Sequence, residues 1–123
     1  MNDERHFDFD TLRFDHVQAH DGVGTIAFKR VIEHGAHGAY RFLDLSVIPP
    51  GATIGAHTHT MDNEELYIVV SGTGVMMLDG EEFPVGPGHV VINRPGGTHG
   101  LRNTGAANMR LVVIEVCVRG EAG

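Results

Sequence analysis

The fold of this chain is decided by residues 51–72, which read Gly51-Ala52-Thr53-Ile54-Gly55-Ala56-His57-Thr58-His59-Thr60-Met61-Asp62-Asn63-Glu64-Glu65-Leu66-Tyr67-Ile68-Val69-Val70-Ser71-Gly72. His57 and His59 alternate along an extended segment, so their imidazoles project from the same face. Glu65 follows His59 after five residues, enough for a turn and re-entry into the next strand. A third histidine, His99, stands far along the chain at the expected entry to another strand. These four side chains are candidates for one shared site.

The donor types in this set predict a metal ion. Three imidazole nitrogens and one carboxylate oxygen suit a divalent transition metal, and the sequence leaves Fe, Mn, Co, Ni, Cu and Zn open. A six-coordinate ion on four protein ligands would keep about two positions free for a substrate. Taken alone, a His-x-His pair is more often part of a polar loop, so the prediction depends on the whole arrangement.

That arrangement resembles the two motifs of the cupin superfamily. Residues 51–72 have the first motif's order: a glycine, five residues, His-x-His, a gap, a glutamate, six residues and a glycine. Residues 88–103 resemble the second motif, with Gly88, Gly96, His99 and Asn103 at its spacing. Fifteen residues separate the motifs, which is typical of microbial cupins. The chain is identified as a small single-domain cupin, and the resemblance implies that His57, His59, Glu65 and His99 hold one divalent transition metal.

The chain departs from the family pattern at two places. The gap before the glutamate is usually three or four residues, and here it is five to Glu65 or four to Glu64. The six-residue count back from Gly72 selects Glu65. In the second motif Arg94 stands where proline is usual, and Pro95 is displaced by one position. Neither departure removes a ligand type.

The rhythm of the whole chain favours an all-β fold. Seventeen glycines and five prolines punctuate short apolar runs, as in a sandwich or barrel. The resemblance narrows this to the cupin double-stranded β-helix, a jelly-roll barrel of two antiparallel sheets. Asp79-Gly80 predicts a tight hairpin, because both residues tolerate positive φ. The predicted strands are Thr25–Val31, Tyr40–Val47, Glu65–Val70, Val75–Leu78, Glu82–Val85, Val90–Asn93, Gly100–Asn103 and Leu111–Val118.

The length of 123 residues predicts one domain. We assign residues 21–123 to a single barrel and residues 1–20 to an N-terminal arm. Phe7 and Phe9 alternate with polar residues in this arm, which favours an added edge strand over a loosely ordered segment.

Composition excludes several classes of protein. A formal charge of −7 argues against a nucleic-acid partner, and no apolar run is long enough for a membrane helix. The acidic start of the chain does not read as a secretory signal. The single cysteine, Cys117, permits no intrachain disulfide and is expected to be buried. We therefore expect a cytoplasmic protein with no membrane or nucleic-acid partner.

The segment Glu65–Val70 predicts a partner surface. Its two faces are Glu65, Tyr67 and Val69 on one side and Leu66, Ile68 and Val70 on the other. Both faces are largely apolar, so both need cover from a second sheet or another subunit. Together with the phenylalanines of the arm, this strand predicts a homodimer.

Three further residues are candidates for catalysis. Tyr67 should face the same way as Glu65 and donate a hydrogen bond to a substrate, although a core tyrosine bonded to a carbonyl is the plainer alternative. Asp44 and Glu115, like Arg41, interrupt otherwise apolar strands. Pointing inward, such charges would bind a polar substrate or act as acid and base; pointing outward, they are solvated side chains.

The resemblance implies chemistry ranging from oxygenases to isomerases and binding domains, and the fold does not choose among them. We expect a metal-dependent enzyme, oxygenase-like or sugar isomerase/epimerase-like, acting on a small oxygen-rich metabolite inside the barrel. The alternative is a non-catalytic module that binds a small ligand or a metal. His34 and His37, in a glycine-rich loop, would form either a lid over the barrel or a plain polar loop.

Overall fold

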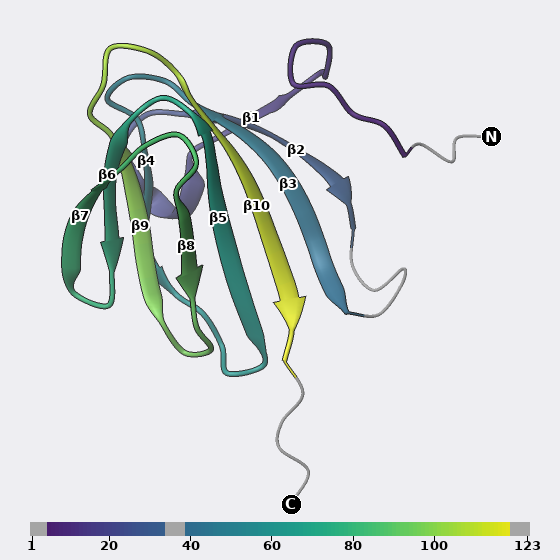
Figure 1. The fold of residues 1–123 in the computed structure, drawn as a ribbon, viewed down its shortest axis with the longest axis vertical. Helices are drawn as coiled ribbons and strands as arrows, with labels where there is room; N and C mark the ends of the chain where they lie inside the picture. Colours follow the sequence, from purple (N-terminus) through teal and green to yellow (C-terminus); the bar gives the residue numbers. More distant parts are fainter. Residues whose placement is uncertain (1–4, 34–38, 119–123) are drawn as a thin grey trace, which may run out of the picture.

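The computed structural model describes residues 5–33 and 39–118, and these form two antiparallel sheets (Figure 1). Six strands form one sheet in the order β1-β2-β3-β10-β5-β8, and four form the other in the order β4-β9-β6-β7. The elements are β1 (Asp15–Val17), the 3-10 turn η1 (Ala19–Asp21), β2 (Ile26–Ile32), β3 (Tyr40–Ile48), β4 (Thr53–Thr58), β5 (Asn63–Ser71), β6 (Gly74–Leu78), β7 (Glu81–Val85), β8 (Val90–Asn93), β9 (Thr98–Asn103) and β10 (Met109–Cys117).

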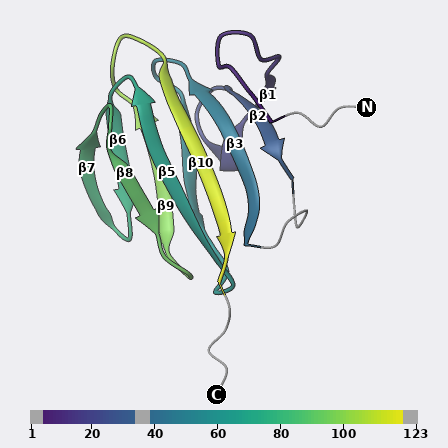
Figure 2. The same ribbon diagram turned by 45° about the vertical axis from the view of Figure 1, so that its right-hand side comes forward.

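The core lies between the two sheets, which face each other in both views (Figures 1 and 2). Alternate residues of β3, β5 and β10 point inward and are buried, as the two-residue period of a strand requires. Ile48, Met109 and Leu111 are fully buried at its centre. This arrangement is the predicted jelly-roll barrel of two antiparallel sheets.

All eight predicted strands are present, with ends within two residues of those expected. The hairpin at Asp79-Gly80 is confirmed, since both residues have positive φ, 49° and 86°. Two strands were not predicted. β1 is only three residues long, and β4 carries polar residues and a glycine that hide its extended conformation in the sequence.

The strand expected at Phe7 and Phe9 does not form. The Asp8 carboxylate accepts a hydrogen bond from the backbone N–H of Asp10, and the Asp8 carbonyl accepts bonds from Thr11 and Leu12. These bonds close a turn, a conformation that aspartate favours through such local bonds. The edge strand of the arm is instead β1, farther along the chain at Asp15–Val17, which pairs with β2.

The turn of the arm contacts β10 of the same chain. Arg110 on β10 forms an ion pair with Asp10 at 2.6 Å, and its guanidinium lies 5.4 Å from the centre of the Phe9 ring. Phe9 in turn stacks with Phe14. Phe9 therefore has aromatic and cationic contacts within its own chain.

The outer side of β5 and β8 presents an apolar face, which we define as Leu66, Ile68, Val70, Val90 and Ile92. Val70 is 46% exposed, Val90 55% and Ile92 37%. The other side of β5 is covered by the opposite sheet, so one of the two apolar faces noted in the sequence lacks cover within the described chain. Contiguous exposed apolar surface of this kind marks interaction sites.

We propose that a second copy of the chain covers this face. Light scattering at micromolar concentration should then give twice the chain mass of 13.3 kDa. The double variant Val90→Lys/Ile92→Lys should shift the mass to that of the monomer, because a lysine at the centre of such an interface loses its hydration. Val23→Lys is the matched control, since Val23 is 66% exposed and lies outside this face. A wild-type monomer, or a double variant that stays dimeric, would contradict the proposal.

Candidate metal centre

The four candidate ligands come from both sheets. His57 lies on β4, His59 directly follows it, and His99 lies on β9. Since β4 and β9 pair with His57 opposite His99, these imidazoles leave one sheet side by side. Glu65 reaches the same point from β5 in the other sheet. The ligand atoms of all four residues lie within 4.8 Å of one another, a cluster that could hold a metal ion.

The spacing of the donor atoms fits a single ion. His59 Nε2 lies 3.1 Å from His99 Nε2. Glu65 Oε1 lies 3.0 Å from His99 Nε2 and 3.4 Å from His59 Nε2. With metal–ligand bonds of about 2.0–2.1 Å, two ligands at right angles lie about 2.9 Å apart and two tetrahedral ligands about 3.4 Å apart. The observed separations fall within this range.

Hydrogen bonds fix the outer nitrogens of two of the imidazoles. His57 Nδ1 donates to the carbonyl of Gly55 at 2.7 Å, and His59 Nδ1 donates to Asn63 Oδ1 at 2.8 Å. A second acceptor, Glu115 Oε1, lies 3.3 Å from the same nitrogen of His59. A proton on Nδ1 leaves Nε2 free to ligate, and such bonds are the usual support of metal-binding histidines.

The charges of the cluster are strongly coupled. Burial opposes the ionised form of Glu65, yet hydrogen bonds with His59 and His99 lower the pKa of Glu65 to about 2. The hydrogen bond to Glu65, opposed by burial, raises the pKa of His59 to about 9. Burial lowers the pKa of His57 to about 4. A metal ion would therefore compete with the proton that His59 holds against Glu65.

The two adjacent glutamates point to opposite sides of β5. Glu65 is 4% exposed and faces the histidines. Glu64 lies on the outer side, where its carboxylate meets Arg94 at 3.5 Å. The count back from Gly72 therefore selects the glutamate that faces inward.

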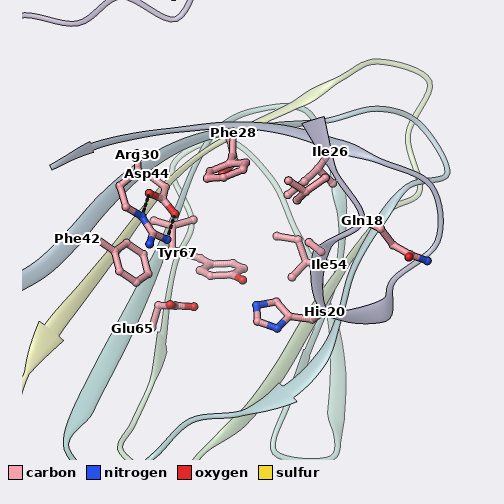
Figure 3. Close-up of a pocket in the computed structure, with 14 residues that line it drawn as sticks. Gln18, His20, Ile26, Phe28, Arg30, Phe42, Asp44, Ile54, Glu65 and Tyr67 are labelled. Atoms are coloured by element: carbon pink, nitrogen blue, oxygen red, sulfur yellow. Dashed lines mark hydrogen bonds and ion pairs between the residues drawn. The ribbon is translucent and has the colours of Figure 1, made fainter. Parts of the chain in front are cut away.

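A cavity of about 270 Å³ adjoins the cluster and shares Glu65 with it. Figure 3 shows Glu65 and Tyr67 on one wall, with His20 across from them. Arg30 and Asp44 also line this space and are joined by two hydrogen bonds of 2.8 and 2.9 Å. The rest of the lining is mainly apolar, including Ile26, Phe28, Phe42, Ile54 and Val113.

Tyr67 lies where the sequence predicts, on the same face as Glu65. It is 3% exposed, and its ring centre lies 4.7 Å from that of His99. Burial raises the pKa of Tyr67 well above its usual value, so the hydroxyl keeps its proton and can donate a hydrogen bond. Tyr67 also lines the cavity.

Asp44 and Glu115 both point inward, but they do different things. Asp44 is 7% exposed and lines the cavity, with both oxygens held by Arg30. Glu115 is 8% exposed and lies behind His59, opposite Glu65 on the paired strands β5 and β10. Burial, and then the charge of Glu65, raise the pKa of Glu115. Arg41 lies 3.5 Å from Glu115 and also 3.5 Å from Asp62, so it supports the cluster from outside.

Several expectations end differently. Cys117 is exposed, because it stands at the end of β10 beyond the buried core, so its predicted burial was wrong. His34 and His37 lie outside the described residues. Arg30 and His20 were not anticipated. The charge of Arg30 inside an apolar strand was a usable signal, whereas the local sequence around His20 offers none.

Comparisons with known proteins agree with this fold. The family model described as "Cupin domain" matches residues 44–115. The oxalate-binding protein of Thermotoga maritima is 27% identical over 94 residues, which cover 76% of this chain and 77% of that protein. The crystal structure of a predicted oxalate decarboxylase from Thermotoga maritima superposes with a TM-score of 0.84 at 22% identity, covering 89% of this chain and 96% of the other.

A putative sugar phosphate isomerase from Acidithiobacillus ferrooxidans is also similar in structure. Its TM-score is 0.73 at 21% identity, and the match covers 89% of this chain and 70% of the other. Likenesses at this level of identity establish the shared fold. Among the described residues, no helix has the length and apolar character needed to cross a membrane.

The assignment of Glu65 leads to a first test of the site. Glu65→Gln should lower metal affinity by more than about 100-fold, since it removes the one negative charge among the ligands while keeping the shape of the side chain. Glu64→Gln should change it by less than about threefold, as surface substitutions usually cost within about 0.5 kcal/mol. Calorimetric metal titration of both variants makes the comparison. Equal losses in the two variants would contradict the assignment.

The coupled pKa values predict a proton release. Because the pKa of His59 is raised to about 9, His59 carries a proton at pH 7 in the metal-free centre and must lose it to bind. Binding at pH 7 should release about one proton per ion from His59, and affinity should fall about tenfold per pH unit from 9 downward. The fall should steepen below pH 4, where His57 also takes a proton. Calorimetry in buffers of different ionisation enthalpy counts these protons, and binding without release at pH 7 would refute the coupling.

Proposed function

The chain belongs to the cupin family, and on this premise we propose that it is a metal-dependent enzyme acting on a small oxygen-rich metabolite inside its barrel. The observation that carries the proposal is the shared wall: Glu65 belongs both to the metal cluster and to the cavity beside it. A molecule in the cavity would thus lie within reach of the open positions of an ion. A volume of about 270 Å³ is at the small end for ligand sites, which favours a small metabolite.

The charges of the cavity favour an anionic substrate. Arg30 and Asp44 offset each other, whereas a divalent ion would outweigh the single charge of Glu65. The loaded cavity would therefore be net positive. Arg30 is also fixed in place, since Asp44 holds it from one side and its guanidinium lies 3.9 Å over the Phe42 ring. We infer that a small carboxylic acid is the substrate class, in line with the oxalate-binding relative.

The protein's own groups have separate roles in this scheme. The Tyr67 hydroxyl donates a hydrogen bond to a substrate oxygen, because burial keeps it protonated. Asp44 orients Arg30, which binds the second acidic or hydroxyl group of the substrate. Glu115 and Asn63 orient His59 from behind. The metal supplies Lewis acidity or oxygen activation when bound.

Two reaction classes fit this arrangement. One is an oxygenase-like reaction; the other is an isomerase- or epimerase-like reaction on a hydroxy acid or sugar. Metal content of protein purified without added metal, followed by an oxygen-uptake screen, separates them: iron with uptake supports the first, and zinc, nickel or manganese without uptake supports the second. We propose a cytoplasmic location, since a single cysteine gives no reason to place the protein in an oxidising compartment.

A second candidate is a non-catalytic binding module. It is favoured by the pairing of Asp44 with Arg30, which occupies the one carboxylate of the cavity that is not a metal ligand. A module of this kind would bind carboxylic acids tightly and return them unchanged. Binding without turnover by any loaded form would support it over the enzyme.

The role of Arg30 gives a test of the substrate class. With Co²⁺-loaded protein, we expect at least one of oxalate, malonate and succinate to bind more tightly than acetate. Arg30→Gln should weaken that diacid by about 10- to 100-fold, since hydrogen bonds to charged groups contribute about 1.5–3 kcal/mol, and should leave acetate within about twofold. Arg30→Lys, which keeps the charge beside Asp44, should retain part of the preference.

Arg102→Gln is the matched control, because Arg102 forms its ion pair with Glu82 outside the cavity. Calorimetric titration of the acids into each loaded variant provides the comparison. An unchanged preference for the diacid in Arg30→Gln would remove Arg30 from the site.

A further inference from the structure

His20 lies against the metal cluster without belonging to it. Its ring is parallel to that of His57, with 3.4 Å between ring centres and 8° between planes. The cluster whose ligand atoms lie within 4.8 Å of one another consists of His57, His59, Glu65 and His99, and does not include His20. The face-to-face stack places His20 over a candidate ligand, and His20 also lines the cavity while remaining exposed.

The segment that carries His20 is fastened to β4. Thr53 bonds Val23 twice: its N–H donates to the Val23 carbonyl at 2.9 Å, and its hydroxyl accepts from the Val23 N–H at 2.7 Å. Gly55 lets the two segments touch, because a Cβ there would lie 2.0 Å from the carbonyl oxygen of His20. Gln18 closes the loop by donating to the Gly22 carbonyl at 3.0 Å. These contacts fix the backbone that carries His20.

The backbone at this point is unfavourable for the residues that occupy it. His20 and Asp21 have φ of 51° and 56°, which lie in the left-handed region that residues other than glycine rarely adopt. Two such residues in succession persist only where the surroundings impose the conformation, and such strain gathers at functional sites. Here the conformation aims the His20 ring at the cavity.

The nitrogens of the His20 ring are not committed elsewhere. Within residues 5–33 and 39–118, no hydrogen bond or ion pair of its imidazole accompanies the stack on His57. Figure 3 shows the ring across the cavity from Glu65 and Tyr67, with open space between them. A neutral imidazole has one N–H donor and one acceptor to offer to a molecule in that space.

We propose that His20 contacts the bound substrate directly, its ring N–H donating a hydrogen bond to a carboxylate oxygen of an acid held at the metal centre. The inference rests on the proposed function, since it needs an acid in the cavity beside a loaded centre. It assigns a role to a residue outside the four candidate ligands. The stack on His57 sets the position of the His20 ring, and the N–H at the ring edge binds the substrate.

The test separates the stack from the hydrogen bond. Co²⁺-loaded protein is titrated with oxalate, followed by the visible spectrum of the ion and by calorimetry, and Co²⁺ affinity is measured first. His20→Phe keeps a stacking ring and loses the N–H, so Co²⁺ affinity should stay within about twofold while oxalate binds about tenfold more weakly. His20→Gln, which restores a donor, should recover most of the oxalate affinity. His16→Phe is the matched control, an exposed histidine on neighbouring β1.

The outcomes are distinct. Oxalate binding equal to wild type in His20→Phe overturns the inference and leaves the proposed function standing. A fall in Co²⁺ affinity with no further change in oxalate affinity also overturns it, because His20 would then only support His57. Wild-type protein that binds Co²⁺ but shows no spectral change with oxalate, malonate or succinate overturns the carboxylic-acid substrate class, and the inference fails with it.

Discussion

The buried carboxylate of Glu65 is the constraint on which the rest of the site depends. An ionised group that is only 4% exposed is costly unless it is paired, and Glu65 has two histidines within 3.4 Å. Those histidines come from the opposite sheet, so the same charge that needs partners also ties the two sheets together at one end of the barrel. A metal ion at this point would satisfy the charge more completely than the shared proton does.

Other buried polar side chains lie around Glu65 and its histidine partners. Asn63, Asn93 and Glu115 are all buried beside Glu65 or its histidine partners, whereas most of the buried residues beyond them are apolar. Asn93, opposite Glu65 on β8, donates to the Gly97 carbonyl in the loop before His99, and its own side-chain oxygen lacks a partner within the described residues. A loop held from inside in this way keeps His99 in register with His57 at the expense of one unsatisfied polar atom.

Much of this was predictable because strands have a period of two. Alternation with Tyr67, together with the count to Gly72 that the cupin motif implies, placed Glu65 inside, and Asp79-Gly80 marked the hairpin between β6 and β7. The failures have local or distant causes. The Asp8 side chain closes a turn that overrides the Phe7 and Phe9 alternation. Arg30 joins the cavity through the pairing of β2 with β3, and His20 joins it through contacts of η1 with β4. The charge of Arg30 in an apolar strand is a local signal, but its place beside Asp44 and the place of His20 depend on segments far apart in the sequence.

The four candidate ligands and His20 are held in place by different kinds of local structure. Three candidate ligands lie on strands and the fourth directly follows one, held by ladders and by bonds to Gly55 and Asn63, so their donor atoms have little freedom. His20 lies on an irregular turn, yet that turn is bonded to β4 and packed against a glycine, so it gains the rigidity of the strand beneath it. That segment contacts β4 through hydrogen bonds with Thr53 and through the stack of His20 on His57. In our proposal, the residue that recognises the ligand thus lies on a different segment from the four residues that would hold the metal.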